Sequence, residues 1–285
     1  MALKQKSFIY GDQVTIADGT SGRIDIAIDA DSHFVVEAMA GISSLRNASQ
    51  DLARVQIVDT STGNAWSNTE VSFRDIFGKG DSPKYLSDPN ILRPTSTLSI
   101  SITNNSGAAA TFYIALIGRK IYNLPEAKFS LLGRRLWFQY ILDVPALTAG
   151  LTGQKATVQI FNESDFLLKK LLASEMITGI QAATAGSESA EILLNLRDTS
   201  RDNSLFNKKL AARLMFGQVQ GSVMTLTDSG SQTVITKGNG APYTLKKPML
   251  LMRNGLIEGE FDNKANSTIA AFKITLEGIR IFDER

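Results

Sequence analysis

The amino-acid sequence predicts an all-β protein built of two tandem antiparallel β-sandwich domains that arose by internal duplication. Two observations carry this prediction. Short segments with alternating or β-branched apolar residues follow one another along the chain, and the second half repeats the pattern of the first. The length agrees with it, because 285 residues with 43% hydrophobic side chains can bury two cores of ordinary size.

The first half contains eight short apolar segments, which clusters of Gly, Asn, Asp and Ser separate, and each is expected to be a strand. The segment TLSISIT places its apolar residues on one face and its hydroxyls on the other, as a half-buried strand requires. In the second half, DFLLKKLLASEMI (165–177) has helical spacing, but its counterpart HFVVEAMAGIS indicates that it begins as a strand. The eight segments are 7–10, 13–17, 24–28, 33–39, 53–59, 70–77, 97–103 and 111–117.

The matches between the two halves keep one order along the chain. Phe8 matches Phe138 near the start and Phe112 matches Phe272 near the end, and the offset between matching segments grows stepwise from the first pair to the last. Each increase in the offset falls in an expected loop, where inserted residues do not disrupt a strand. This is typical of a diverged duplication. The matching pairs are FIYGDQV with FQYILDV, IDADSHFVV with IFNESDFLL, DTSTGNAWSN with DTSRDNSLFN, RDIFG with RLMFG, and TFYIALIGRKIY with AFKITLEGIRIF.

This repeat predicts the domain boundaries. The first sandwich domain is expected at 1–122, a linker at 123–136, and the second sandwich domain at 137–285. The largest step in the offset marks an insertion at 218–241, whose two β-branched runs around DSGS predict an added hairpin. A disordered polar loop is the alternative interpretation of this insertion.

Each half also contains a segment with the pattern Pro-x-x-Leu-x-x-Pro-x-x-Leu, PKYLSDPNIL (83–92) and PYTLKKPMLL (242–251). Proline cannot donate a hydrogen bond to a β-ladder and favours an extended residue before it. We therefore expect an extended connection outside the sheet interior, held to the core by its leucines. A proline-rich ligand for a partner's groove is the functional alternative.

The composition excludes several classes of chemistry. The chain has no cysteine, which excludes disulfides, thiolate nucleophiles and zinc sites built on Cys, and it has one histidine. Its 30 basic and 28 acidic residues are scattered singly, so no nucleic-acid footprint is expected. No apolar run is long enough for a membrane span, and the N-terminal segment lacks the apolar core of a signal peptide.

Few residues suggest a catalytic or metal site. His33 lies beside Asp31 and Ser32, but no Gly-x-Ser-x-Gly motif is present and the matching residue in the second half is Asp165. A surface or loop histidine is the expected role. Asp29 and Asp31 could begin a calcium loop, although the required glycine and distal glutamate are missing.

Other features have structural explanations as well. GKGD (78–81) fits no phosphate-binding motif and is expected to be a turn. Four aromatic residues could stack on a sugar, but Trp66 matches Leu205, which favours packing. These aromatic residues are Trp66, Trp137, Tyr140 and Tyr243. Twin lysines occur only in the second half, at 169–170, 208–209 and 246–247, where solvated faces are the expected role and contact with an acidic first half is the alternative.

The chain resembles two known groups of proteins. The segment FGKGDSPKYLSDPNILRPTSTLSISITNNSGAAATFYIALIGRKIY (77–122) resembles a unit of bacteriophage virion structural proteins, and its counterpart departs from it at Gln218 and in the insertion. Two tandem eight-stranded sandwiches in a chain of this length resemble the double jelly-roll capsid proteins of icosahedral phages. This resemblance implies a shell subunit, often a trimer whose six jelly rolls mimic a hexamer.

The sequence thus predicts a non-enzymatic structural component of a bacteriophage virion, most simply a capsid or capsid-associated protein. A tail, collar or tail-tip protein is the alternative within this class. A carbohydrate-binding protein is the alternative outside it, with a glycosidase third. No catalytic, cofactor-binding or metal-binding residue is predicted. The expected partners are copies of the chain and other virion proteins, without nucleic acid. The expected location is the virion, after synthesis in the host cytoplasm.

Overall fold

The structure is a computed structural model that describes residues 4–44, 53–79, 82–132, 134–174, 192–212, 243–264, 268 and 271–283. The described residues form antiparallel sheets joined mostly by short turns, as the alternating apolar segments predict. The hairpin expected at 218–241 lies outside the described residues. None of the described helices is long and apolar enough to cross a membrane.

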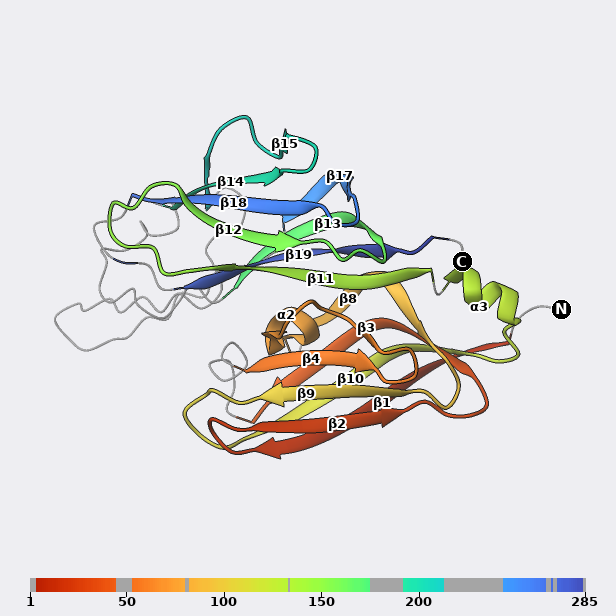
Figure 1. The fold of residues 1–285 in the computed structure, drawn as a ribbon. Coiled ribbons are helices and arrows are strands. Elements are labelled where there is room, and N and C mark those ends of the chain that lie inside the picture. Colours follow the sequence, from red (N-terminus) through yellow and green to blue (C-terminus); the bar gives the residue numbers. More distant parts are fainter. Residues whose placement is uncertain are drawn as a thin grey trace. The chain divides into compact units, whose positions relative to one another are not determined.

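The first sandwich consists of two sheets whose strands interleave along the chain (Figure 1). One sheet has the order β1-β10-β3-β8-β7, and the other has the order β2-β9-β4-β5 with β6 also paired to β4. Its strands are β1 Gln5–Ile16, β2 Ser21–Ala27, β3 His33–Ser43, β4 Arg54–Asp59, β5 Asn64–Ala65, β6 Val71–Ser72, β7 Gly78–Lys79, β8 Ser82–Leu92, β9 Thr97–Thr103 and β10 Ala110–Ile121.

The second sandwich repeats this arrangement. Its sheets have the orders β11-β19-β13-β17 and β12-β18-β14-β15, with β16 also paired to β14. Each of these strands is the counterpart of one in the first sandwich, so both sandwiches have the jelly-roll type of strand order. The strands are β11 Arg135–Val144, β12 Gln154–Gln159, β13 Asp165–Ser174, β14 Ile192–Asp198, β15 Asn203–Ser204, β16 Leu210–Ala211, β17 Tyr243–Leu251, β18 Leu256–Asn263 and β19 Phe272–Ile281.

Matching hydrogen bonds confirm the duplication at the level of single residues. The backbone N–H of Trp66 donates to the carbonyl of Ile57 at 2.9 Å, and the N–H of Leu205 donates to the carbonyl of Leu196 at 2.8 Å. The two donors are matching residues of DTSTGNAWSN and DTSRDNSLFN, and the two acceptors stand equally far before them in the sequence. The fold is therefore an all-β pair of jelly-roll-like sandwiches, and β13 confirms that 165–174 is a strand.

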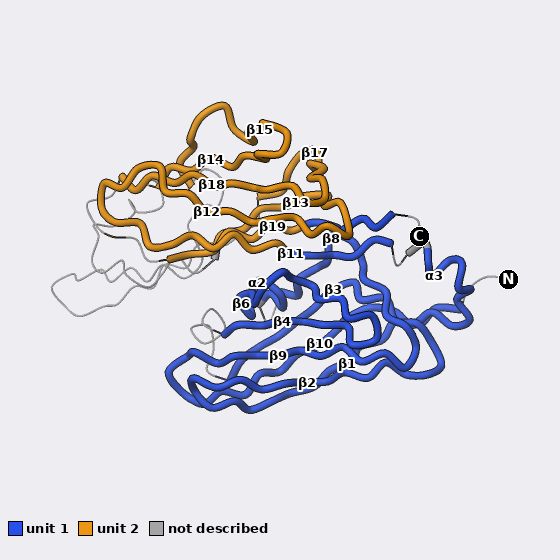
Figure 2. Tube along the Cα trace, viewed as in Figure 1, with its two compact units in different colours: residues 1–139, 278–285 blue, residues 140–277 orange. Residues whose placement is uncertain are grey.

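The chain divides into two compact units, shown in blue and orange in Figure 2. The first comprises Met1–Gln139 with Gly278–Arg285, and the second comprises Tyr140–Glu277. The division falls within β11 and β19, so the first compact unit contains the beginning of one strand and the end of the other. The boundaries 1–122, 123–136 and 137–285 remain a prediction about the duplication.

The two proline-containing segments correct one expectation. They are strands β8 and β17, each paired with the third strand of its sandwich, and not connections between sheets. Both ladders are interrupted at the same place, because pairing is broken over residues 86–89 in β8 and over residues 245–248 in β17. The second proline of each pattern lies in this interruption, where no ladder hydrogen bond requires its missing N–H.

Two further segments differ from expectation. Only Val71 and Ser72 of the expected strand 70–77 are a strand, whereas Phe73–Phe77 form the short helix α2, whose residues are all buried. The spacing of Phe73, Ile76 and Phe77 suits one face of a helix. The expected linker contains the helix α3, Glu126–Leu132, and its Phe129 packs in a cluster with Val35 and Ile121.

Candidate interaction surfaces

The described residues assemble no evident catalytic constellation. Among them, no group of three or more His, Asp and Glu side chains could hold a metal ion. His33 begins β3, and its ring centroid lies 5.0 Å from that of Phe129. Burial is the main reason that the pKa of His33 is lowered. The hydroxyl of Ser32 donates to Asp31 at 2.7 Å, which is a local turn contact and not a nucleophile with its base.

The two aspartates of the possible calcium loop face a lysine. Lys120, whose side chain is buried, pairs with Asp29 and lies 3.6 Å from Asp31. The hydrogen bond from Lys120 is the main reason that the pKa of Asp29 is lowered. The one ammonium group thus offsets part of the negative charge of these two carboxylates, and Lys120 also lies 4.2 Å from the ring centroid of Phe8.

The candidate sugar-stacking aromatics are mostly buried. Trp66, Trp137 and Tyr140 are fully buried, and the two tryptophan rings meet edge to face at 6.3 Å. Tyr243 is exposed at the start of β17. The packing expected for Trp66 is confirmed, since a fully buried ring offers no face to a sugar.

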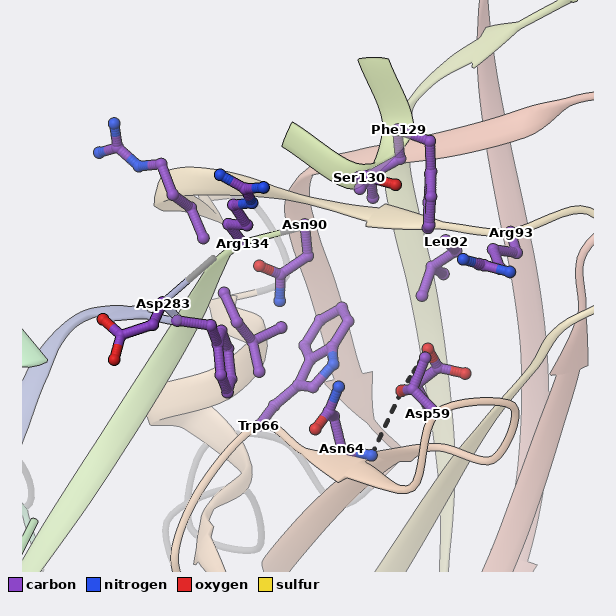
Figure 3. Close-up of a pocket in the computed structure, with 15 residues that line it drawn as sticks. Asp59, Asn64, Trp66, Asn90, Leu92, Arg93, Phe129, Ser130, Arg134 and Asp283 are labelled. Carbon is purple, nitrogen blue, oxygen red and sulfur yellow. Dashed lines mark hydrogen bonds between the residues drawn. The ribbon is translucent and has the colours of Figure 1, made fainter. Parts of the chain in front are cut away.

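A pocket of about 550 Å³ lies within the first compact unit, with Trp66 between Asn64 and Asn90 in its wall (Figure 3). Two of its arginines are held by carboxylates of the chain: Arg93 lies 2.9 Å from Glu126, and Arg135 lies 2.8 Å from Asp88. These ion pairs connect α3 and the first residue of β11 to β8 and the turn after it. We assign no ligand to this pocket.

The twin lysines of the second half have different environments. Lys170 pairs with the buried Glu277 at 3.2 Å, and Lys209 lies 2.7 Å from Glu260 and 2.6 Å from Asp262. By contrast, residues 246 and 247 are exposed in the interruption of β17. Two of the three lysine pairs therefore contain a lysine that forms an ion pair within the second sandwich.

The outer edge of β11 is covered within the first compact unit, which no pattern in the sequence indicates. The N–H of Gln139 donates to the carbonyl of Trp66 at 3.0 Å, and the N–H of Asn68 donates to the carbonyl of Gln139 at 3.2 Å. These bonds frame a parallel β-bridge between Ser67 and Gln139. The segment 66–68 thus adds a short strand to the edge of β11.

The equivalent edge in the first sandwich is uncovered. The strand β1 matches β11 and is the last strand of its sheet, so no described strand pairs with its other edge. The counterpart of Gln139 is Ile9, whose exposed fraction is 61%, whereas Gln139 is fully buried. Ile42, Tyr85 and Tyr113 are also exposed on this sheet, and Tyr113 pairs directly with Ile42. An exposed apolar surface of this kind is typical of a protein contact.

Comparison with known proteins finds likeness in structure only. No family model matches the sequence, and no curated protein matches it. A chain from the atomic structure of Sulfolobus Turreted Icosahedral Virus aligns with a TM-score of 0.52 and 11% identity, over 96% of this chain and 91% of that one. PBCV-1 VP54, fitted into a reconstruction of the virophage Sputnik, aligns with a TM-score of 0.42 and 8% identity, over 99% and 97% of the two chains. The first likeness extends over both sandwiches and concerns the fold.

Proposed function

We propose that this chain is a non-enzymatic structural protein of a bacteriophage virion, a capsid or capsid-associated subunit that assembles with copies of itself. The likeness of nearly the whole chain to a chain of an icosahedral virus is the observation that carries the proposal. Fold alone does not determine function, so surface features must support it as well.

Two such features support the proposal. The first sandwich exposes large apolar side chains on one sheet, as a surface that must meet a neighbour would. The duplicated sandwiches present matching surfaces, of which the edge of β11 is covered and the edge of β1 is uncovered. A shell subunit with several neighbours uses repeated contacts of this kind.

Electron microscopy of the purified protein tests this function. We expect ring-shaped oligomers, flat regular lattices or closed shells as the concentration rises. Antibodies raised against the protein should label the shell of phage particles produced by cells that carry the gene. Labelling confined to tails would replace the capsid role with a tail role. A protein that labels no particle, remains monomeric and binds a glycan array tightly would contradict the proposal and favour a carbohydrate-binding protein.

A further inference from the structure

Among the described residues, the contact between segment 66–68 and β11 occurs once, although the chain contains two copies of each participant. In the second sandwich, the counterparts of Trp66, Ser67 and Asn68 are Leu205, Phe206 and Asn207. The local backbone is the same, because the N–H of Leu205 makes the same bond to its own sandwich as the N–H of Trp66. The geometry that covers the edge of β11 is therefore present a second time.

This second copy of the segment lies uncovered. Trp66 and Ser67 are buried, whereas Leu205 and Phe206 are only half-buried and Asn207 is exposed. Within the described part of the chain, the carbonyl of Leu205 and the N–H of Asn207 make no hydrogen bond to another backbone group. They are the counterparts of the two groups that bind Gln139.

We infer that the segment Leu205–Asn207 of one copy of this chain binds the free edge of β1 in a second copy, with Phe206 bridging Ile9. The N–H of Ile9 would donate to the carbonyl of Leu205, and the N–H of Asn207 would donate to the carbonyl of Ile9. This is the bonding of Gln139 with Trp66 and Asn68, transferred to the matching residues. The inference deepens the proposed function, and it rests on that function only for its biological setting.

The side chains differ between the bridge within the chain and the bridge proposed between copies, and the difference fits their roles. The bridge within the chain joins Ser67 and Gln139, two polar residues that covalent connection already keeps together. The bridge between copies would join Phe206 and Ile9, two apolar residues whose burial stabilises an association. Ile9 is 61% exposed in the single chain, so most of its side chain remains to be buried.

The two surfaces are different, so the contact is heterologous. Each chain would offer one β1 edge and one segment Leu205–Asn207, and successive copies would associate head to tail. Such a contact closes into a ring if the rotation between copies permits it, and otherwise continues as a filament. In such a ring, each junction between two chains would have the same geometry as the contact between Ser67 and Gln139 within one chain.

A disulfide trap tests the contact, and the absence of cysteine in the chain makes it specific. The variants Ile9→Cys and Phe206→Cys are mixed in equal amounts under mild oxidation and analysed on a non-reducing gel. Directly bridged residues are close enough for a disulfide. We expect a band at the mass of two chains, a disulfide-linked dimer that contains one chain of each cysteine variant. The matched control replaces Ile9→Cys by Gln13→Cys, which lies on the same edge of β1 and should give no dimer.

A second variant tests the same edge without a cross-link. Ile9→Pro removes the N–H that would bind Leu205 but no ladder bond, because the counterpart N–H of Gln139 also points away from its sheet. This variant should lose self-association in sedimentation velocity, whereas Gln13→Pro should retain it. The circular dichroism spectrum of Ile9→Pro should match that of the wild type.

The outcomes distinguish this inference from the proposed function. If wild-type particles form but Ile9→Cys and Phe206→Cys give no more dimer than the control, the contact is elsewhere and the inference fails while the function stands. If Ile9→Cys forms dimers with itself in preference to Phe206→Cys, the edges meet isologously and the inference also fails. If the mixed disulfide forms but antibodies label no virion, the contact is correct and the proposed function fails.

Discussion

At the scale of single residues, the repeat predicts contacts as well as strands. The hydroxyl of Tyr10 accepts the N–H of Asp29 at 3.2 Å, and the hydroxyl of Tyr140 accepts the N–H of Phe161 at 2.9 Å. The ring of Tyr10 meets that of Phe34 edge to face with centroids 4.8 Å apart, and the ring of Tyr140 meets that of Phe166 at the same distance. The hydroxyl of a tyrosine that packs into a sandwich needs a hydrogen-bond partner, and both sandwiches supply it from the same backbone position.

At another pair of equivalent positions, the two sandwiches carry side chains of different charge. Thr103 donates a hydrogen bond to Glu70 in the first sandwich, whereas their counterparts Asp262 and Lys209 form an ion pair in the second. Burial acts to raise the pKa of Asp262, but hydrogen bonds from Lys209 and from the N–H of Gly153 outweigh it, so the pKa is lowered. No pattern in the sequence distinguishes this lysine from its exposed neighbours.

The lowered pKa gives a prediction about stability and pH. Because the folded state favours ionised Asp262, its contribution is present above the unfolded pKa of about 3.9 and is lost as the pH falls through the lower folded value. Asp262→Asn should reduce the free energy of unfolding by about 1–2 kcal/mol at pH 7, with little difference from the wild type near pH 2. Urea unfolding measured across this pH range checks the result.

The exposed pair Arg23–Asp25 provides the control for this substitution. Asp25→Asn should change the free energy of unfolding by less than about 1 kcal/mol at any pH, since an exposed ion pair contributes little. Equal effects of Asp25→Asn and Asp262→Asn at pH 7 would contradict the role given to Lys209.

At the scale of elements, alternation of apolar residues predicted most strands, and the exceptions have physical causes. The prolines predict that 83–92 and 242–251 are extended connections outside the sheet interior, but both segments pair as strands, with the second proline where the ladder is interrupted. The helix α2 is only five residues long, too short for its period to be distinguished from that of a strand. In α3, the burial of Phe129 against Val35 depends on a sheet that is distant in sequence.

The ends of the strands depend on two equivalent asparagines. The amide of Asn104 donates to the carbonyls of Ile16 and Ala108 at 3.0 and 2.9 Å, and the amide of Asn263 donates to those of Leu147 and Thr148 at 2.9 and 3.0 Å. Both asparagines are fully buried. Each therefore makes one buried hydrogen bond, to the carbonyl of Ile16 or Leu147, and one to a carbonyl that also accepts from Ser106 or Leu151.

Removing either asparagine should destabilise its sandwich. Asn104→Ala and Asn263→Ala should each reduce the free energy of unfolding by about 1–3 kcal/mol, because the carbonyls of Ile16 and Leu147 lose a buried donor. The two effects should add, since the residues belong to different compact units. Chemical denaturation of the single and double variants measures this. Gln13→Ala, at an exposed position, is the control, and an equal effect of Gln13→Ala would contradict the expectation.

At the scale of the whole molecule, the compact units do not coincide with the repeats. The first compact unit includes the first residues of β11, where the backbone N–H of Trp137 donates to the side-chain oxygen of Asn90 at 2.7 Å. Trp66 and Trp137 are the two tryptophans of the chain, and both are fully buried in this unit. Their contact joins a turn of the first repeat to the start of the second.

This contact predicts a large effect of one substitution. Trp137→Ala should reduce the free energy of unfolding by about 3–5 kcal/mol, because it leaves a cavity beside Trp66 and Asn90. Trp137→Phe should cost less, since it retains part of the ring contact. Tryptophan fluorescence during urea unfolding follows the first compact unit directly. Unchanged unfolding of Trp137→Ala would show that the contact contributes nothing.

The sequence by itself determined the all-β class, the duplication and the positions of most strands, because the period of apolar residues and the spacing of turns are local properties. It also indicated a chain with few residues suited to catalysis. Only the tertiary structure decided that the proline segments pair as strands, that Trp66 and Trp137 meet, and that β11 is covered where β1 is exposed. These depend on which surfaces approach each other across long stretches of chain, as between Ser67 and Gln139, and no local pattern encodes such an approach.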